Sequence, residues 1–167
     1  MRRALSSSAT WRMERTVPGT DRVFKSSGDV ACDLGGGGGI VWRTLAPFAS
    51  TVSMRKDAMV FEDEDGRREK PAGDMPHYED IRKATDAFAA GDDGAFARVF
   101  DTSASALPGG RWKIVMKPRG SAAGKLVEYA AIEGAGLPET VVIRAANGGE
   151  SRISFKRKEG DAGKKER

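Results

Sequence analysis

Few residues of the types that catalyse reactions or bind metals occur in the chain. Cys32 is the only cysteine and His77 the only histidine, so no second thiol is present for an internal disulfide, for redox exchange or for a Cys-x-x-Cys zinc site. No G-x-S-x-G turn or other nucleophile elbow accompanies His77, which follows Pro76 at the start of a predicted helix. The sequence therefore predicts a protein that is not an enzyme and that has no metal and no cofactor.

A run of glycines, Gly35–Gly39, has the composition of a phosphate-binding loop. The backbone amides of such loops bind anions, but a P-loop leads into a helix through a lysine and a serine or threonine. Here β-branched and aromatic residues follow at Ile40–Trp42, which is typical of a strand. We interpret the glycine run as a flexible connection between strands.

Charge leaves two alternative functions open. The formal net charge is +4, and clustered lysines and arginines attract phosphates and anionic head groups. The cations near the C-terminus are Lys156, Arg157, Lys158, Lys164, Lys165 and Arg167. They make a basic nucleic-acid-binding or anionic-surface-binding module the main alternative, although no aromatic residues are interleaved with them for base stacking, so we expect no nucleic acid as partner. Acidic pairs such as Asp63 and Asp65 suggest a small lipid-directed enzyme, but acidic runs in turns usually face solvent.

Hydrophobic patterning predicts strands on both sides of a helical region. The predicted strands are 10–17, 23–32, 40–45, 51–55, 58–61, 112–117, 126–133, 139–145 and 151–156. Between the two sets, a helix begins after Pro76 and ends at Gly91, and a short helical turn covers 92–100. Because strands and helices do not alternate, we predict an α+β fold with an antiparallel sheet and helices on one of its faces.

Length and composition predict a single domain. A chain of 167 residues buries roughly two-thirds of its unfolded surface on folding. We assign residues 1–9 to an N-terminal segment, 10–157 to the domain and 158–167 to a disordered basic tail. No apolar run approaches the ~18 residues that span a bilayer. The charged start Met1–Arg3 is followed by serines and charged residues, so we expect no export signal in the chain as printed.

Several segments occur in an order and spacing that resemble a known family. They are Lys25-Ser26-Ser27-Gly28, Ile40-Val41-Trp42-Arg43-Thr44 followed by Pro47, the acidic turn Glu62–Gly66, the helix end Phe88–Asp92, and the strand Trp112–Arg119. Over residues 10–155 this order resembles the LolA-like outer-membrane lipoprotein carriers. The resemblance implies an incomplete β-barrel, in which helices cover the concave face of a curved antiparallel sheet and enclose an apolar cavity.

The resemblance also implies a function and partners. The function is that of a periplasmic carrier or chaperone that binds acyl chains of lipoproteins or related lipids and passes them to the outer membrane. The partners are an inner-membrane donor and an outer-membrane acceptor. We expect a monomer. Methionine and aromatic side chains suit an adaptable acyl cavity, and the candidates for its lining are Trp42, Phe48, Met54, Phe61, Ile81, Phe88, Trp112, Ile114 and Met116. The same residues would also fill an ordinary packed core, so both interpretations stay open.

Overall fold

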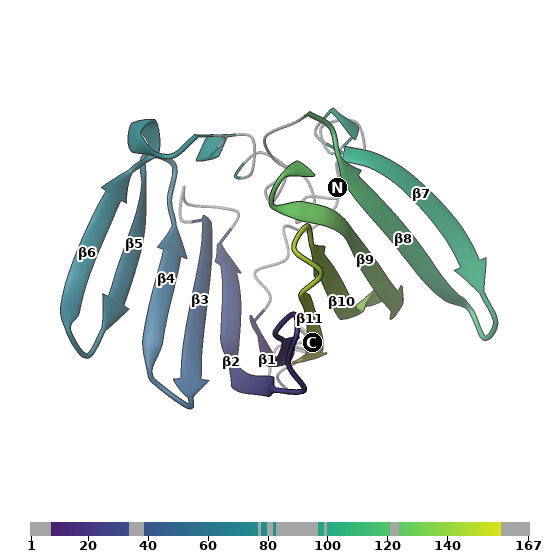
Figure 1. Ribbon diagram of the computed structural model, residues 1–167, viewed down its shortest axis with the longest axis horizontal. Helices are drawn as coiled ribbons and strands as arrows, with labels where there is room; N and C mark the ends of the chain where they lie inside the picture. Colours follow the sequence, from purple (N-terminus) through teal and green to yellow (C-terminus); the bar gives the residue numbers. More distant parts are fainter. Residues whose placement is uncertain are drawn as a thin grey trace, which may run out of the picture.

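One large antiparallel sheet dominates the protein. The computed structural model describes residues 8–33, 39–76, 78–79, 82, 97–98, 100–120 and 124–157. Within them, 11 strands form a sheet in the order β6-β5-β4-β3-β2-β1-β11-β10-β9-β8-β7. The sheet is curved and not closed, and its edge strands β6 and β7 lie at opposite ends of the long axis (Figure 1). The predicted curved antiparallel sheet is therefore confirmed.

The chain enters and leaves this sheet at its middle. The first half contains β1 (Ser8–Thr16), β2 (Val23–Asp33), β3 (Gly39–Ala46), β4 (Ser50–Met54), β5 (Ala58–Asp63), β6 (Gly66–Pro71) and the 3-10 turn η1 (Ala72–Asp74). The second half contains β7 (Phe100–Leu107), β8 (Arg111–Pro118), β9 (Val127–Ala135), β10 (Leu137–Ala145) and β11 (Glu150–Arg157). Each half is a meander, and β1 pairs with both β2 and β11. We call β2–β6 the N-terminal wing and β7–β10 the C-terminal wing.

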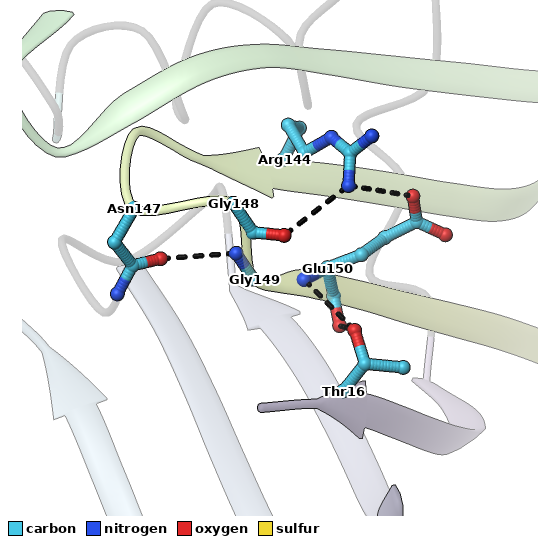
Figure 2. A network of polar contacts seen from close by, with 6 residues as sticks. All are labelled: Thr16, Arg144, Asn147, Gly148, Gly149 and Glu150. Carbon is cyan, nitrogen blue, oxygen red and sulfur yellow. Dashed lines mark hydrogen bonds and ion pairs between the residues drawn. The ribbon is translucent and has the colours of Figure 1, made fainter. Parts of the chain in front are cut away.

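A polar network holds the two halves together where β1 ends (Figure 2). The Thr16 hydroxyl donates to the carbonyl of Glu150 at 3.3 Å and accepts from the backbone N–H of Glu150 at 3.2 Å. Arg144, opposite Glu150 in β10, donates to the carbonyl oxygen of Gly148 at 3.2 Å and forms an ion pair with Glu150 at 3.8 Å. The network therefore fixes the β10–β11 turn and the register of β11 on β1 at the same place.

The structure confirms the predicted interior strands and adds both edge strands. Each predicted strand overlaps a strand of the sheet, with shifts of at most two residues at the ends. β6 and β7 were not predicted. The helical turn expected over 92–100 is wrong at its last residue, because Phe100 begins β7. β6 lacks the alternation of apolar and polar residues that marks a strand with one covered face, and in β7 the alternation involves only the small residues Ser103 to Ala106.

Most of the predicted helical cover lies outside the described residues. Tyr78, Glu79 and Arg82 have helical backbone, but the rest of the predicted helix up to Gly91 is not among the described residues. The covering helices therefore stay a prediction. In the described part of the chain, no helix has both the length and the apolar character needed to cross a bilayer.

The domain boundaries can be compared with the sheet at both ends. β1 begins at Ser8, so the first strand starts within the segment 1–9 that the sequence assigns to an N-terminal extension. β11 ends at Arg157, the last residue of the predicted domain. The predicted disordered tail, 158–167, lies outside the described residues.

Tyr78 attaches the chain after β6 to the turn between β4 and β5. Its side chain is 3% exposed, and its hydroxyl lies 2.6 Å from the carbonyl oxygen of Arg55 and 2.9 Å from that of Ala58. Ala58 and Val60 in β5 are 3% and 2% exposed. Together these residues form a small buried cluster at one end of the N-terminal wing.

Candidate functional site

Strand register assigns the apolar side chains to one face of the sheet. Successive side chains of a strand point to opposite faces, and directly paired residues of neighbouring strands share a face. In the N-terminal wing, a row of paired residues consists of Val30, Trp42, Val52 and Phe61. A second row, Met13, Ile153, Val141, Ile132 and Ile114, crosses the centre and the C-terminal wing. We call the surface that carries both rows the apolar face.

An aromatic cluster joins the two halves of the sheet on this face. The rings of Trp11 and Trp42 stack with centroids 4.6 Å apart, and Phe155 meets Trp42 edge-on at 6.2 Å. The indole N–H of Trp11 donates to the backbone oxygen of Asp29 at 3.1 Å. Trp11 pairs with both Phe155 in β11 and Gly28 in β2. The cluster therefore spans the line along which β1 connects the halves of the sheet.

Gly28 is required by the close approach of β2 and β3 beside this cluster. The pairing of the two strands is irregular between Ser27 and Gly28. A Cβ atom added at Gly28 would lie 1.8 Å from the carbonyl oxygen of Arg43, a backbone atom that cannot rotate away. Any larger residue would therefore displace β3, which carries Trp42.

Burial on the apolar face is greatest in a band from β1 and β11 through β9 to β8, which we call the centre of the face. Along this band Trp11 is 2% exposed, Ile153 8%, Ile132 5% and Met116 6%. Trp42 and Phe61 in the N-terminal wing and Trp112 in the C-terminal wing are only half-buried. The centre is thus a packed core, whereas the flanks keep aromatic area that is not fully covered.

The structure brings six of the nine predicted site residues onto this one face. Trp42, Met54 and Phe61 lie on it in the N-terminal wing, and Trp112, Ile114 and Met116 lie on it in β8. Phe48 does not belong to it, because it lies in the turn after β3 and is 76% exposed. Ile81 and Phe88 lie outside the described residues.

Sequence reasoning missed the centre of the face. Trp11 and Phe155 were not proposed as site residues, although the alternation of Trp11 and Met13 among charged neighbours was visible. Ile132 and Ile153 were missed as well. What makes Trp11, Phe155 and Ile153 central is the pairing of the first strand with the last, and no local pattern reveals a contact between the two ends of a chain.

The opposite face of the sheet, which we call the charged face, carries ion pairs between directly opposite residues. The pairs are Lys25–Glu14 at 3.6 Å, Arg43–Asp29 at 3.2 Å, Lys113–Glu133 at 3.1 Å and Arg144–Glu150 at 3.8 Å. At these positions each cation faces an acid, so the four pairs present no basic patch that would favour nucleic acid as a ligand.

A groove of about 720 Å³ lies on the charged face of the C-terminal wing. Its apolar residues Val115, Ala131 and Val142 are directly paired across β8, β9 and β10. Longer side chains surround this row, and the charged ones are Lys113, Lys117, Arg152, Glu128, Glu133 and Glu150. The equal number of acids and bases gives the groove no preference for a charged ligand, and none of the predicted site residues lines it.

The described residues show no metal centre. No group of three or more histidine, cysteine, aspartate or glutamate side chains among them could hold a metal ion. His77 is not among the described residues. The absence of catalytic and metal chemistry stays a prediction.

Comparisons with known proteins identify similar structures but no relatives by sequence. No family model and no curated protein matches the chain. The LolA superfamily protein NE2245 from Nitrosomonas europaea is similar with a TM-score of 0.48 and 6% identity, over 93% of this chain and 86% of that one. A putative outer membrane lipoprotein-sorting protein domain from Vibrio parahaemolyticus gives 0.43 and 9%, over 92% and 86%. The MucA/MucB complex of Pseudomonas aeruginosa gives 0.39 and 14%, over 89% of this chain and 50% of the matched one.

The structural neighbours thus include LolA superfamily proteins, the family that the sequence resembles. With TM-scores below 0.5, this likeness carries no argument about the site. The case for the site rests on the register and burial of the apolar face.

Proposed function

We propose that the protein is a non-enzymatic carrier that binds acyl chains of lipoproteins or related lipids on the apolar face of its sheet. The proposal includes a periplasmic location, an inner-membrane donor and an outer-membrane acceptor. The observation that supports it is the set of half-buried aromatic and methionine side chains on the flanks of the apolar face, including Trp42, Met54, Phe61 and Trp112.

These side chain types suit reversible binding. Each buried methylene contributes roughly 0.8 kcal/mol, so a rigid pocket for several acyl chains would hold its ligand almost irreversibly. Thioethers such as that of Met54 adapt to different shapes, and the rings of Trp42 and Trp112 supply area with few rotatable bonds. A wall of this composition releases its ligand when an acceptor competes for it.

The proposal also includes the predicted helices after Pro76 as a cover for the bound chains. Near the start of this segment, the Tyr78 hydroxyl contacts the β4–β5 turn at the carbonyl oxygens of Arg55 and Ala58. This contact attaches the start of the segment to the N-terminal wing.

Titration with an environment-sensitive acyl dye tests the proposal. We expect micromolar-range binding by the unmodified chain. The variants Trp42→Ala and Trp112→Ala should each weaken binding by about tenfold, equivalent to about 1.4 kcal/mol, because each removes a ring from the flanks of the apolar face. Mass spectrometry of natively purified protein would then identify the bound lipid.

Tyr129→Ala supplies a matched control. Tyr129 is also a half-buried aromatic residue, but it lines the groove on the charged face. Its loss should leave dye binding unchanged. If Tyr129→Ala weakens binding as much as Trp112→Ala does, the dye occupies the charged face and the proposal is wrong. If Trp42→Ala and Trp112→Ala lower stability and binding in parallel, the apolar face is an ordinary core.

A further inference from the structure

The two edges of the sheet differ in how well they are protected from pairing with another strand. An edge strand presents unpaired N–H and C=O groups, and proteins usually protect such edges with charged residues or proline. β6 has both, because it contains Arg67, Arg68, Glu69 and Lys70 and ends at Pro71. β7 contains one charged residue, Asp101, and its remaining residues are apolar or small and polar. The β7 edge therefore lacks the protection that β6 has.

The β7 edge is also accessible. All residues from Asp101 to Ala106 are exposed, and no described strand pairs with the outer side of β7. The carboxylate of Asp101 already forms an ion pair with Arg119 at 2.7 Å. The stretch 102–106, with the sequence Thr-Ser-Ala-Ser-Ala, is therefore an exposed and uncharged edge of five residues.

We propose that β7 pairs with β7 of a second copy of this chain, antiparallel and about a twofold axis perpendicular to the sheet. Such an axis leaves the apolar faces of both copies on the same side, so each residue pairs with one whose side chain lies on the same face. Two registers then centre the contact on the middle of β7. In one, Ala104 lies opposite Ala104 and Ser103 opposite Ser105. In the other, Ser103 lies opposite Ser103 and Asp101 opposite Ser105. Neither register places like charges opposite each other.

The same symmetry disfavours β6 as the pairing edge. Pairing β6 with its own copy would place Arg68 opposite Arg68 in one register, which offsets the favourable pairing of Arg67 with Glu69 there. In the other it would place Glu69 opposite Glu69 and Arg68 opposite Lys70. Like charges directly opposite each other destabilise a strand pair. The charge pattern of the two edges therefore selects β7 as the site of self-association.

A second copy fits this edge better than an unstructured peptide. β8 already holds β7 extended along its whole length, from Phe100 opposite Pro118 to Leu107 opposite Arg111. Two such preformed strands lose little conformational freedom on pairing, whereas a peptide must first be ordered. The pairing would also make the apolar faces of the two copies continuous across β8 and β7, independently of whether they bind acyl chains.

Light scattering or sedimentation at increasing concentration tests this proposal. Between about 1 μM and about 1 mM, the range of weak association, the measured mass should rise from the chain mass of 17.9 kDa toward twice that value. The double variants S103K/S105K and S103E/S105E should each keep the single-chain mass, and an equal mixture of the two should associate again. Glu69→Lys on β6 is the control and should associate like the unmodified chain.

Disulfide cross-linking identifies the register. Directly opposite residues of an antiparallel pair lie within the Cα distance that a disulfide needs, so Ala104→Cys or Ser103→Cys should cross-link about tenfold faster than Arg68→Cys on β6. Peptide mass spectrometry distinguishes this bond from one through the native Cys32. A single-chain mass throughout the concentration range, a dimer that persists in S103K/S105K, or equal cross-linking at Arg68→Cys would each overturn the proposal.

Discussion

The two faces of the sheet consist of the same strands and yet have opposite character. Ile114 and Val115 are neighbours in β8, but Ile114 belongs to the row of apolar residues that crosses the centre of the sheet, whereas Val115 lines a groove bordered by charged side chains. Position along the strand, more than residue type, therefore decides what a side chain does. The apolar face stabilises the fold and carries the candidate binding residues, while the charged face is held by cross-strand ion pairs.

One part of the sheet does not follow this contrast between an apolar and a charged face. Val60 lies on the charged face, because Phe61 beside it pairs with Val52 on the apolar face, yet Val60 is only 2% exposed. Tyr78, whose hydroxyl reaches the carbonyl oxygen of Ala58, is buried at the same end of the wing. The charged face thus has a small core of its own where the chain after β6 is attached.

The largest expected effect is at the centre of the apolar face. Trp11→Ala removes a ring that is 2% exposed and stacked on Trp42, and it should lower the free energy of unfolding by about 3–5 kcal/mol. Urea unfolding followed by circular dichroism measures this loss. Phe24→Ala, at a position that is 57% exposed, is the control. Similar losses in the two variants would show that the centre is not the core of the sheet.

A smaller effect should separate the two faces directly. Ile114→Asp places a carboxylate on the apolar face and should lower the free energy of unfolding by on the order of 2 kcal/mol. Val115→Asp places the same group between Lys113 and Lys117 on the charged face, where the loss should be about 1 kcal/mol or less. Urea midpoints of the two variants, measured side by side, make the comparison. Equal midpoints would contradict the assignment of faces.

The interior of the fold could be predicted from the sequence, but its edges could not. In strands such as Trp112–Lys117, the alternation of apolar and polar residues indicates that one face is covered. In an edge strand, less of the side-chain surface is covered. β6 is charged along most of its length, and β7 alternates only between serine and alanine, so neither has large apolar residues on one face. The sequence therefore assigns Phe100 to a helical turn.

The candidate site could be predicted only in part, for a related reason. Trp42, Phe61 and Trp112 were found because large apolar residues in predicted strands suggest a covered face. The place of Trp11 opposite Phe155 depends on pairing between the two ends of the chain, which no local pattern contains. Phe48 illustrates the opposite error, since an aromatic residue next to a strand was taken for part of the face although it lies in an exposed turn.

Tyr78→Phe tests the buried cluster at the end of the N-terminal wing. The variant keeps the ring but removes the hydroxyl that bonds to the turn between β4 and β5, leaving part-buried carbonyl oxygens without that donor. The free energy of unfolding should fall by about 1–3 kcal/mol. If Tyr78 attaches the segment there, the rate of hydrogen exchange of the β5 amides should also increase in this variant. Unchanged exchange would show that the attachment does not depend on this hydroxyl.

The smallest expected effect belongs to the ion pairs of the charged face. Lys113 and Glu133 lie 3.1 Å apart with side chains 37% and 36% exposed, so water screens much of their attraction. A double-mutant cycle with Lys113→Ala and Glu133→Ala should give a coupling of about 0.2–1 kcal/mol that decreases as salt is added. The pair Lys25–Glu14, which is more exposed and longer at 3.6 Å, should couple more weakly. A coupling far above this range, or one that salt does not change, would mean that the charged face is shielded from water, and the contrast between the two faces would then lose its basis.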